Sequence, residues 1–347
     1  MRRSVHVRHG IRPLAVAVVV TIGLLAAGAA GAASLQRTYL GQVASEELGR
    51  AVADAGDVNG DGQGDVIVGV SGFDGSRGRV RVFSGADGAI LWTFVGESAN
   101  DQFGKAVAGN VDVNNDGAPD LIVGAPNRAT GNGNGSGKAY VFSGATGALL
   151  YSWDGEAALD NFGISVDGAG NVNGGAFDDI LVGARNGGAN NTGRVYVYSG
   201  FNGSLLRGHD GSVADGDFGS ALARAGDMTG DGREEYIAGS PFHAGGEGRA
   251  YVFDGASGAV LAFMDGEPGF FSRFGYAVSG AGDIDGDGLT EIVVGAWKFN
   301  PPPDGDERGK VYVYGLNAVG APPNLLHTWV GEANQDYFGI SVSGAGD

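Results

Sequence analysis

A nine-residue acidic segment that recurs along the chain is the strongest constraint on its fold. Its copies are DVNGDGQGD at 57–65, DVNNDGAPD at 112–120, NVNGGAFDD at 171–179, DMTGDGREE at 227–235 and DIDGDGLTE at 283–291. Their starts lie 55, 59, 56 and 56 residues apart, and Asp347 begins a sixth copy after a gap of 64. A near-constant period of this length indicates a repeat architecture in which each repeat is one supersecondary unit.

The residues around each acidic segment repeat in step with it. Upstream stand Leu48-Gly49 and then Phe-Gly pairs that begin at Phe103, Phe162, Phe218, Phe274 and Phe338. Downstream come short β-branched runs such as DVIVG, alternating segments such as GRVRVFSG, and a fourth segment such as ILWTFVGE. These runs are too short for helices and are typical of strands. Four short strands per repeat predict an all-β fold, a β-propeller of four-stranded antiparallel blades.

The predicted propeller covers residues 34–347, with five complete repeats and the start of a sixth. The approximate repeats are 40–94, 95–153, 154–209, 210–264, 265–329 and the partial 330–347. A row of independent sandwiches is the structural alternative, but a unit of under 60 residues buries little surface alone. Gly makes up 68 of 347 residues without a Gly-X-Y period, and 43% of residues are apolar, so collagen and disorder both fit poorly.

The N-terminal segment indicates export. Arg2, Arg3, Arg8 and Arg12 precede an apolar run from Leu14 to about Ala30, and small residues follow it. We interpret residues 1–33 as a signal peptide, with an uncleaved N-terminal anchor as the alternative.

Loss of this segment changes the net charge from −18 to −22, because it removes four arginines and no acidic residue. Because the chain is so acidic, nucleic acid is a disfavoured partner and divalent cations are favoured ones. The mature chain has no second predicted membrane segment and no Cys for a disulfide brace.

The repeated Phe-Gly pair, the D-x-[DN]-x-D-G-x-x-[DE] segment and the triplet Gly124-Ala125-Pro126 resemble FG-GAP repeats, the blades of integrin α-chain propellers. The resemblance covers roughly residues 40–347. It implies a seven-bladed ring, so this chain is either a fragment or an unusual ring. It also implies that the acidic segments are calcium loops and that ligands bind on the face opposite them. There the variable segments between the second and third strands are the expected partner contacts: Gly72–Arg77, Asn127–Lys138, Arg185–Thr192, Phe242–Gly248 and Lys298–Arg308.

The acidic segments have the residue types of calcium loops. Side-chain oxygens at positions 1, 3 and 5 can surround one centre, Gly at position 6 allows the bend, and a carboxylate at position 9 can close the shell. An EF-hand is excluded because position 12 is an apolar strand residue, Val68 in the first copy. The predicted ligands are Asp57, Asn59, Asp61 and Asp65; Asp112, Asn114, Asp116 and Asp120; Asp227, Thr229, Asp231 and Glu235; and Asp283, Asp285, Asp287 and Glu291.

The third segment lacks most of these ligands. It carries Asn171, Asn173 and Gly175 at positions 1, 3 and 5 and keeps Asp179 at position 9, with Asp178 beside it. The sequence therefore predicts about four Ca²⁺ ions and a degenerate third loop. Without ions each intact cluster repels itself, so calcium is expected to brace the fold.

No catalytic or organic-cofactor site is predicted. The sequence has no HExxH, GxSxG or phosphate-cradling motif, and His209, His243 and His327 stand at unrelated places in their repeats. We expect an exported or cell-surface module that binds or adheres to an extracellular protein or glycan. One alternative is a propeller-scaffold enzyme, such as a glycan or lipid hydrolase. A quinoprotein-like dehydrogenase is suggested only by Trp92 and Trp153 near blade-docking positions. A structural module within a longer surface protein is the remaining alternative.

Overall fold

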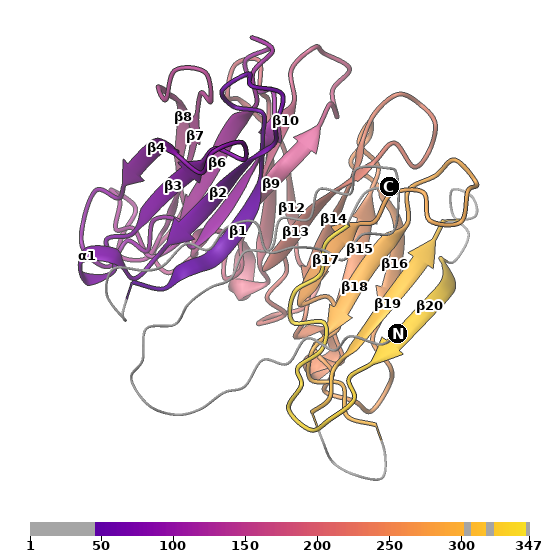
Figure 1. The fold of residues 1–347 in the computed structure, drawn as a ribbon. Helices are drawn as coiled ribbons and strands as arrows, with labels where there is room; N and C mark the ends of the chain where they lie inside the picture. Colours follow the sequence, from indigo (N-terminus) through magenta and orange to yellow (C-terminus); the bar gives the residue numbers. More distant parts are fainter. Residues whose placement is uncertain (1–45, 302–306, 317–322, 345–347) are drawn as a thin grey trace.

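The chain folds into consecutive four-stranded antiparallel sheets (Figure 1). A computed structural model describes residues 46–301, 307–316 and 323–344. The predicted signal peptide at 1–33 and the sixth acidic segment at Asp347 lie outside these residues. The described residues form five such sheets, each a meander in which strands follow in chain order. The prediction of an all-β fold of four-stranded propeller blades is confirmed.

The sheets are built from strands of four to nine residues. The first two sheets contain β1 (Leu48–Gly56), β2 (Asp65–Val70), β3 (Arg79–Phe83) and β4 (Ile90–Val95), then β5 (Ala106–Val111), β6 (Asp120–Ala125), β7 (Lys138–Phe142) and β8 (Leu149–Asp154). The third contains β9 (Phe162–Gly170), β10 (Asp179–Ala184), β11 (Arg194–Tyr198) and β12 (Leu205–Asp210). The last two contain β13 (Ala221–Gly226), β14 (Glu235–Ser240), β15 (Arg249–Phe253) and β16 (Val260–Asp265), then β17 (Ala277–Gly280), β18 (Ile292–Ala296), β19 (Lys310–Gly315) and β20 (Asn324–Val330). Short helical turns lie at α1 (Phe73–Ser76), η1 (Ala189–Asn191) and η2 (His243–Gly246).

The first strand of each sheet lies nearest the middle of the molecule. In Figure 1 the strands β1 and β17 face inward, whereas β4 and β20 lie at opposite outer margins. Residues from β1, β5, β9, β13 and β17 line one shared cavity of about 360 Å³, so these strands surround a common axis. The second strands are buried on both faces, as in β2 and β6, because neighbouring sheets cover them. This is why they are continuous apolar runs rather than alternating ones.

The repeated Phe packs between neighbouring sheets. Phe103 lies in one buried cluster with Ile67, Val80 and Val82 of the first sheet and Leu121 of its own. Its ring meets Tyr140 edge to face at 5.3 Å, and the same pair recurs at Phe162–Tyr196, Phe218–Tyr251 and Phe274–Tyr312. Edge-to-face contacts between aromatic rings add to the stabilisation from buried area. The Phe of the motif is thus an inter-sheet wedge.

The two repeated glycines meet across the same interface. A Cβ added to Gly69 of β2 would lie 2.0 Å from the carbonyl oxygen of Gly104, which precedes β5 in the next sheet. The pairs Gly124–Gly163, Gly183–Gly219, Gly239–Gly275 and Gly295–Gly339 show the same approach, at 1.9 to 2.0 Å. No side chain fits between the two backbones at this distance. The glycine of Gly-Ala-Pro and the glycine of Phe-Gly are therefore sterically required partners.

A second set of contacts joins sheets at their outer edge. The indole N–H of Trp92 in β4 donates to the carbonyl of Gly144 at 2.8 Å, and that of Trp153 in β8 donates to Gly203 at 2.9 Å. Both acceptors lie in the turn between the third and fourth strands of the next sheet. These tryptophans are accordingly structural residues that dock one sheet on the next.

Substitution Gly124→Ala tests the glycine contact. Because the new methyl group would overlap the Gly163 carbonyl, we expect the free energy of unfolding to fall by roughly 2 kcal/mol or more. The matched control is Gly131→Ala, where an added Cβ meets nothing within 4 Å. Chemical denaturation of both variants measures the difference. Equal stability of the two variants would contradict the proposed steric requirement.

Candidate metal-binding loops

The five acidic segments occupy equivalent places in the fold. Each connects the first strand of a sheet to the second, as residues 57–65 connect β1 to β2. Because all the sheets are meanders around one axis, the loops emerge on the same face of the molecule. Position 12, by contrast, lies inside the second strand, for example Val68 in β2. The loop therefore leads directly into a strand and has no EF-hand helix after it.

The side chain at position 1 organises the loop backbone. Asp57 accepts hydrogen bonds from the N–H groups of Asp61 at 3.0 Å and Gly62 at 2.7 Å. Asp112, Asp227 and Asp283 accept the equivalent bonds in their loops. The glycine at position 6 has positive φ, +84° at Gly62, a conformation that other residues adopt with strain. The bend is thus built by one acidic side chain and one glycine.

The side chain at position 9 has a structural task that the sequence did not reveal. Asp65 is 1% exposed, and its two oxygens accept the N–H groups of Val58 and Gly85, both at 2.9 Å. Gly85 lies in the turn that follows β3, so this carboxylate joins the loop to that turn. Asp120, Asp179 and Glu235 accept the equivalent pairs of bonds. Even the degenerate third loop keeps this residue, so position 9 does not depend on a metal for its role.

Burial of position 9 also affects its charge. Desolvation raises the pKa of Asp120 to about 6 and that of Glu235 to about 7, against the opposing effect of the backbone hydrogen bonds. The pKa values of Asp65 and Glu291 are raised for the same reason. A nearby positive charge favours the ionised form of such a group. The protein thus carries, beneath each of these loops, a buried carboxyl group that a cation would stabilise.

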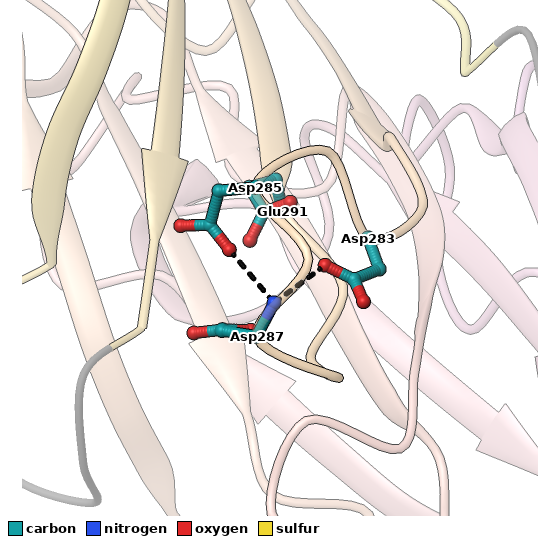
Figure 2. A group of neighbouring side chains, drawn as sticks. All are labelled: Asp283, Asp285, Asp287 and Glu291. Carbon is teal, nitrogen blue, oxygen red and sulfur yellow. Dashed lines mark hydrogen bonds between the residues drawn. The ribbon is translucent and has the colours of Figure 1, made fainter.

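The fifth loop brings its four carboxylates together (Figure 2). One oxygen from each of Asp283, Asp285, Asp287 and Glu291 lies within 4.8 Å of the others. The backbone N–H of Asp287 donates to both Asp283 and Asp285 at 3.1 Å, which holds the three residues in one turn. No ion pair is found for these carboxylates among the described residues. This cluster of hard oxygen donors could hold a divalent cation.

The first, second and fourth loops have a neutral side chain at position 3. The amide of Asn59 donates to Asp61 at 2.8 Å, and that of Asn114 donates to Asp116 at 2.9 Å. In the fourth loop the hydroxyl oxygen of Thr229 is buried and has no hydrogen-bond partner among the described residues. A buried hydroxyl without a partner is unfavourable. A cation bound in this loop could supply the missing partner.

The third loop satisfies itself with hydrogen-bond donors. The amide of Asn171 donates to the carbonyl of Gly175 at 2.7 Å, and the amide of Asn173 donates to Asp179 at 2.9 Å. Arg233, from the fourth loop, donates to the carbonyl of Val172 at 3.2 Å, and its guanidinium lies against Gly174. Amide and guanidinium N–H groups therefore satisfy oxygens of this loop, and the guanidinium adds a positive charge beside it. The sequence indicated the lost ligands but not this replacement.

The histidines stand in three separate elements. His209 lies in the edge strand β12, where its Nε2 is 2.8 Å from the Tyr236 hydroxyl and its ring packs on Phe253 of the next sheet. Burial lowers the pKa of His209 to about 4, so the ring is neutral near pH 7. His243 begins η2, and His327 lies in β20. His209 therefore belongs to inter-sheet packing, which its strand-edge position alone did not indicate.

The fold and its loops define a β-propeller of repeated blades with an acidic loop after each first strand. The family model of the FG-GAP repeat matches residues 50–83, 103–142 and 274–314. Integrin alpha-5 of Xenopus laevis is 30% identical over 246 residues, which is 65% of this chain and 22% of that protein. Integrin alpha-V of Gallus gallus is 32% identical over 209 residues, 55% of this chain and 19% of that protein. The chain thus contains FG-GAP repeats and is similar in sequence to integrin α chains over more than half of its length.

The chain spans about a fifth of the length of these curated relatives. Because the relatives are integrin α chains, they support the expectation of a protein that is not an enzyme. Within the described residues, no helix has the length and apolar character needed to cross a membrane.

The third loop can be converted into a test of the ligand pattern. We expect N171D/N173D/G175D/R233Q to bind one more calcium ion than the unmodified chain, because it restores acidic ligands and removes the guanidinium. The matched control is R233Q alone, which removes the guanidinium and adds no ligand. Native mass spectrometry counts the ions on each variant. An unchanged count in the fourfold variant, with its melting transition intact, would show that positions 1, 3 and 5 do not determine binding.

Proposed function

We propose that the chain is a calcium-braced propeller that acts outside the cell or at the cell surface as a binding or adhesion module for a protein or glycan. The observation that carries this proposal is the register of the acidic loops. Four loops that carry the predicted ligand residues emerge on one face of a chain similar in sequence to integrin α chains, and the fifth loop brings its four carboxylates together. Their residues are the predicted ligands of loops one, two, four and five.

Calcium suits these loops better than other common cations. The donors are carboxylates, amide and hydroxyl oxygens, which hard cations prefer, and the loops contain neither Cys nor His. Flexible oxygen-rich turns with six or more donors suit Ca²⁺, whereas Mg²⁺ prefers a strict octahedron with retained waters. Since the chain has no Cys, bound ions are its proposed cross-links.

The proposed partner surface is the face opposite the calcium loops. The segments between second and third strands lie there, because the second strand runs away from the acidic loop. They differ in length and sequence more than the strands do, as in Asn127–Lys138 compared with Gly72–Arg77. Of the fifth such segment, Lys298–Arg308, residues 302–306 lie outside the described residues. Variable loops on a rigid scaffold are the usual place for recognition.

Removal of calcium tests the metal half of the proposal. A site that is saturated a hundredfold above its dissociation constant stabilises the fold by about 2.7 kcal/mol. For several such sites we expect excess chelator to lower the melting temperature by roughly 10 °C or more. Asp285→Asn should reduce this shift, whereas Asp154→Asn, which removes the same charge from a strand, should not. If neither calcium nor chelator changes the melting temperature, calcium does not stabilise the fold.

Adhesion tests the binding half. The calcium-loaded full chain, coated on a surface, is expected to retain cells or extracellular matrix material. Replacement of residues 129–135 by a Gly-Ser segment of equal length should weaken retention about tenfold, because it removes side chains of the long variable loop Asn127–Lys138 on the partner face. The control, Gln63→Ala, changes the calcium-loop face. If Gln63→Ala weakens retention and the loop replacement does not, the partner surface lies on the calcium-loop face and the proposal is wrong.

A further inference from the structure

The axial mouth on the face opposite the calcium loops carries an unusual group of cations. Val52, Val107, Val166, Leu222 and Val278 occupy matching register positions, each opposite the middle of its neighbouring second strand. The residues two places earlier therefore share one level around the axis. They are Arg50, Lys105, Ile164, Ser220 and Tyr276. Because the first strands run from this mouth toward the calcium loops, this level forms the opening of the axis.

The aliphatic residues form a floor beneath this opening. Val107, Val166, Leu222 and Val278 line the axial cavity together with Val342 of the sixth repeat. The polar residues that line the same cavity, among them Asp54, Asn110, Asp167 and Arg224, stand further along the first strands, toward the calcium loops. Charges at the mouth must therefore be balanced by neighbours at the same level or by a ligand.

Lys105 is the centre of the group. It is half-buried, and its ammonium group has no hydrogen bond or ion pair with another described residue. Burial lowers the pKa of Lys105, and repulsion by Arg50 and Arg185 adds to that effect, with Glu47 opposing it. Arg185 is positioned by the bond from its Nε to Asn161 at 3.2 Å. Arg50 and Lys105 thus occupy equivalent register positions at this level, and the charge of Arg185 acts on Lys105 from the next sheet.

The neighbouring carboxylates only partly offset these cations. Glu47 already accepts a hydrogen bond from the Ser71 hydroxyl at 2.8 Å. Asp217 interacts with both Arg185 and Arg273, so it is shared between two arginines. In a chain with a net charge of −18, an excess of cations at one mouth makes a local positive field in a negative surface. Such a field attracts and orients anions.

An aromatic wall lies at the same level. Tyr276 is 41% exposed and meets Trp297 edge to face at 5.6 Å, and Trp297 meets Tyr337 at 5.3 Å. The indole N–H of Trp297 is buried and has no acceptor among the described residues. Tyr337 belongs to the sixth repeat, directly before Phe338. The mouth therefore combines cations, the aromatic wall and the indole N–H of Trp297, which has no acceptor among the described residues.

We propose that this mouth binds an acidic saccharide, with a sugar carboxylate at Lys105, Arg50 and Arg185 and a sugar ring against Tyr276 and Trp297. The inference rests on the proposed function and gives its ligand a chemical class. A uronic acid presents a carboxylate and a rigid ring with an apolar C–H face, so it uses both halves of the mouth. An acidic peptide would use the cations alone. Charge-assisted hydrogen bonds from Lys and Arg to a carboxylate are strong enough to orient such a ligand.

Binding of three matched probes to the calcium-loaded full chain tests this proposal by calorimetry. The probes are a hexasaccharide of glucuronic acid, a neutral hexasaccharide of glucose and a hexapeptide of glutamate. We expect the uronate to bind at least ten times more tightly than either other probe. Lys105→Gln and Tyr276→Ala should each weaken uronate binding about tenfold. Arg77→Gln, which removes a charge on the rim of the same face where Arg77 pairs with Asp74, should leave it unchanged.

Four results would overturn the proposal. Equal binding of the glutamate peptide would make the site a general acceptor of acidic chains. An equal loss of uronate affinity in Arg77→Gln would show that binding depends on the total charge of this face and not on the mouth. The proposal also fails if the unmodified chain does not bind the uronate, or if Lys105→Gln, melting as the unmodified chain does, binds it equally well. Adhesion to another ligand would then still stand, so the proposed function and this inference fail separately.

Discussion

The close approach of two backbones between neighbouring sheets is the constraint on which the structure depends. Gly69 and Gly104 show it first, and four equivalent pairs follow along the chain. This approach lets the Phe wedge fill the space beside the glycines, as Phe103 does against the first sheet. With the sheets fixed in this way, every first strand lies beside the common axis, and the acidic loops and the axial mouth take their places at its two ends.

The acidic loops combine a structural role with a proposed metal role. The buried carboxylate at position 9 joins its loop to the turn after the third strand, and it does so in the third loop as well. Positions 1 and 5 differ between loops, because both are Asp in four loops and neither is acidic in the third. In the third loop Asn171 and Gly175 stand where the other four loops have Asp, and the guanidinium of Arg233 donates to the loop backbone at Val172. The protein thus shows two solutions to one problem of charge balance.

Periodicity made most of the fold predictable from sequence. The Phe-Gly pairs, the β-branched runs and the acidic segments each mark a strand or a turn, and the strands formed where those patterns placed them. The metal ligands were expected from spacing alone, and the structure brings Asp283, Asp285, Asp287 and Glu291 together. Contacts between repeats were not predictable, because they join residues 27 to 61 positions apart. The docking of Trp92 on Gly144, the burial of His209 and the bond from Arg233 to Val172 are of this kind.

The measurement that tests the central claim most directly is a crystal structure of the chain grown in calcium, with anomalous scattering used to place the ions. The account predicts four peaks, each within bonding distance of the side chains at positions 1, 3 and 5 of loops one, two, four and five. It predicts none in the third loop, where Arg233 and the asparagine amides stand. A peak in the third loop, or empty first, second, fourth and fifth loops at saturating calcium, would contradict it.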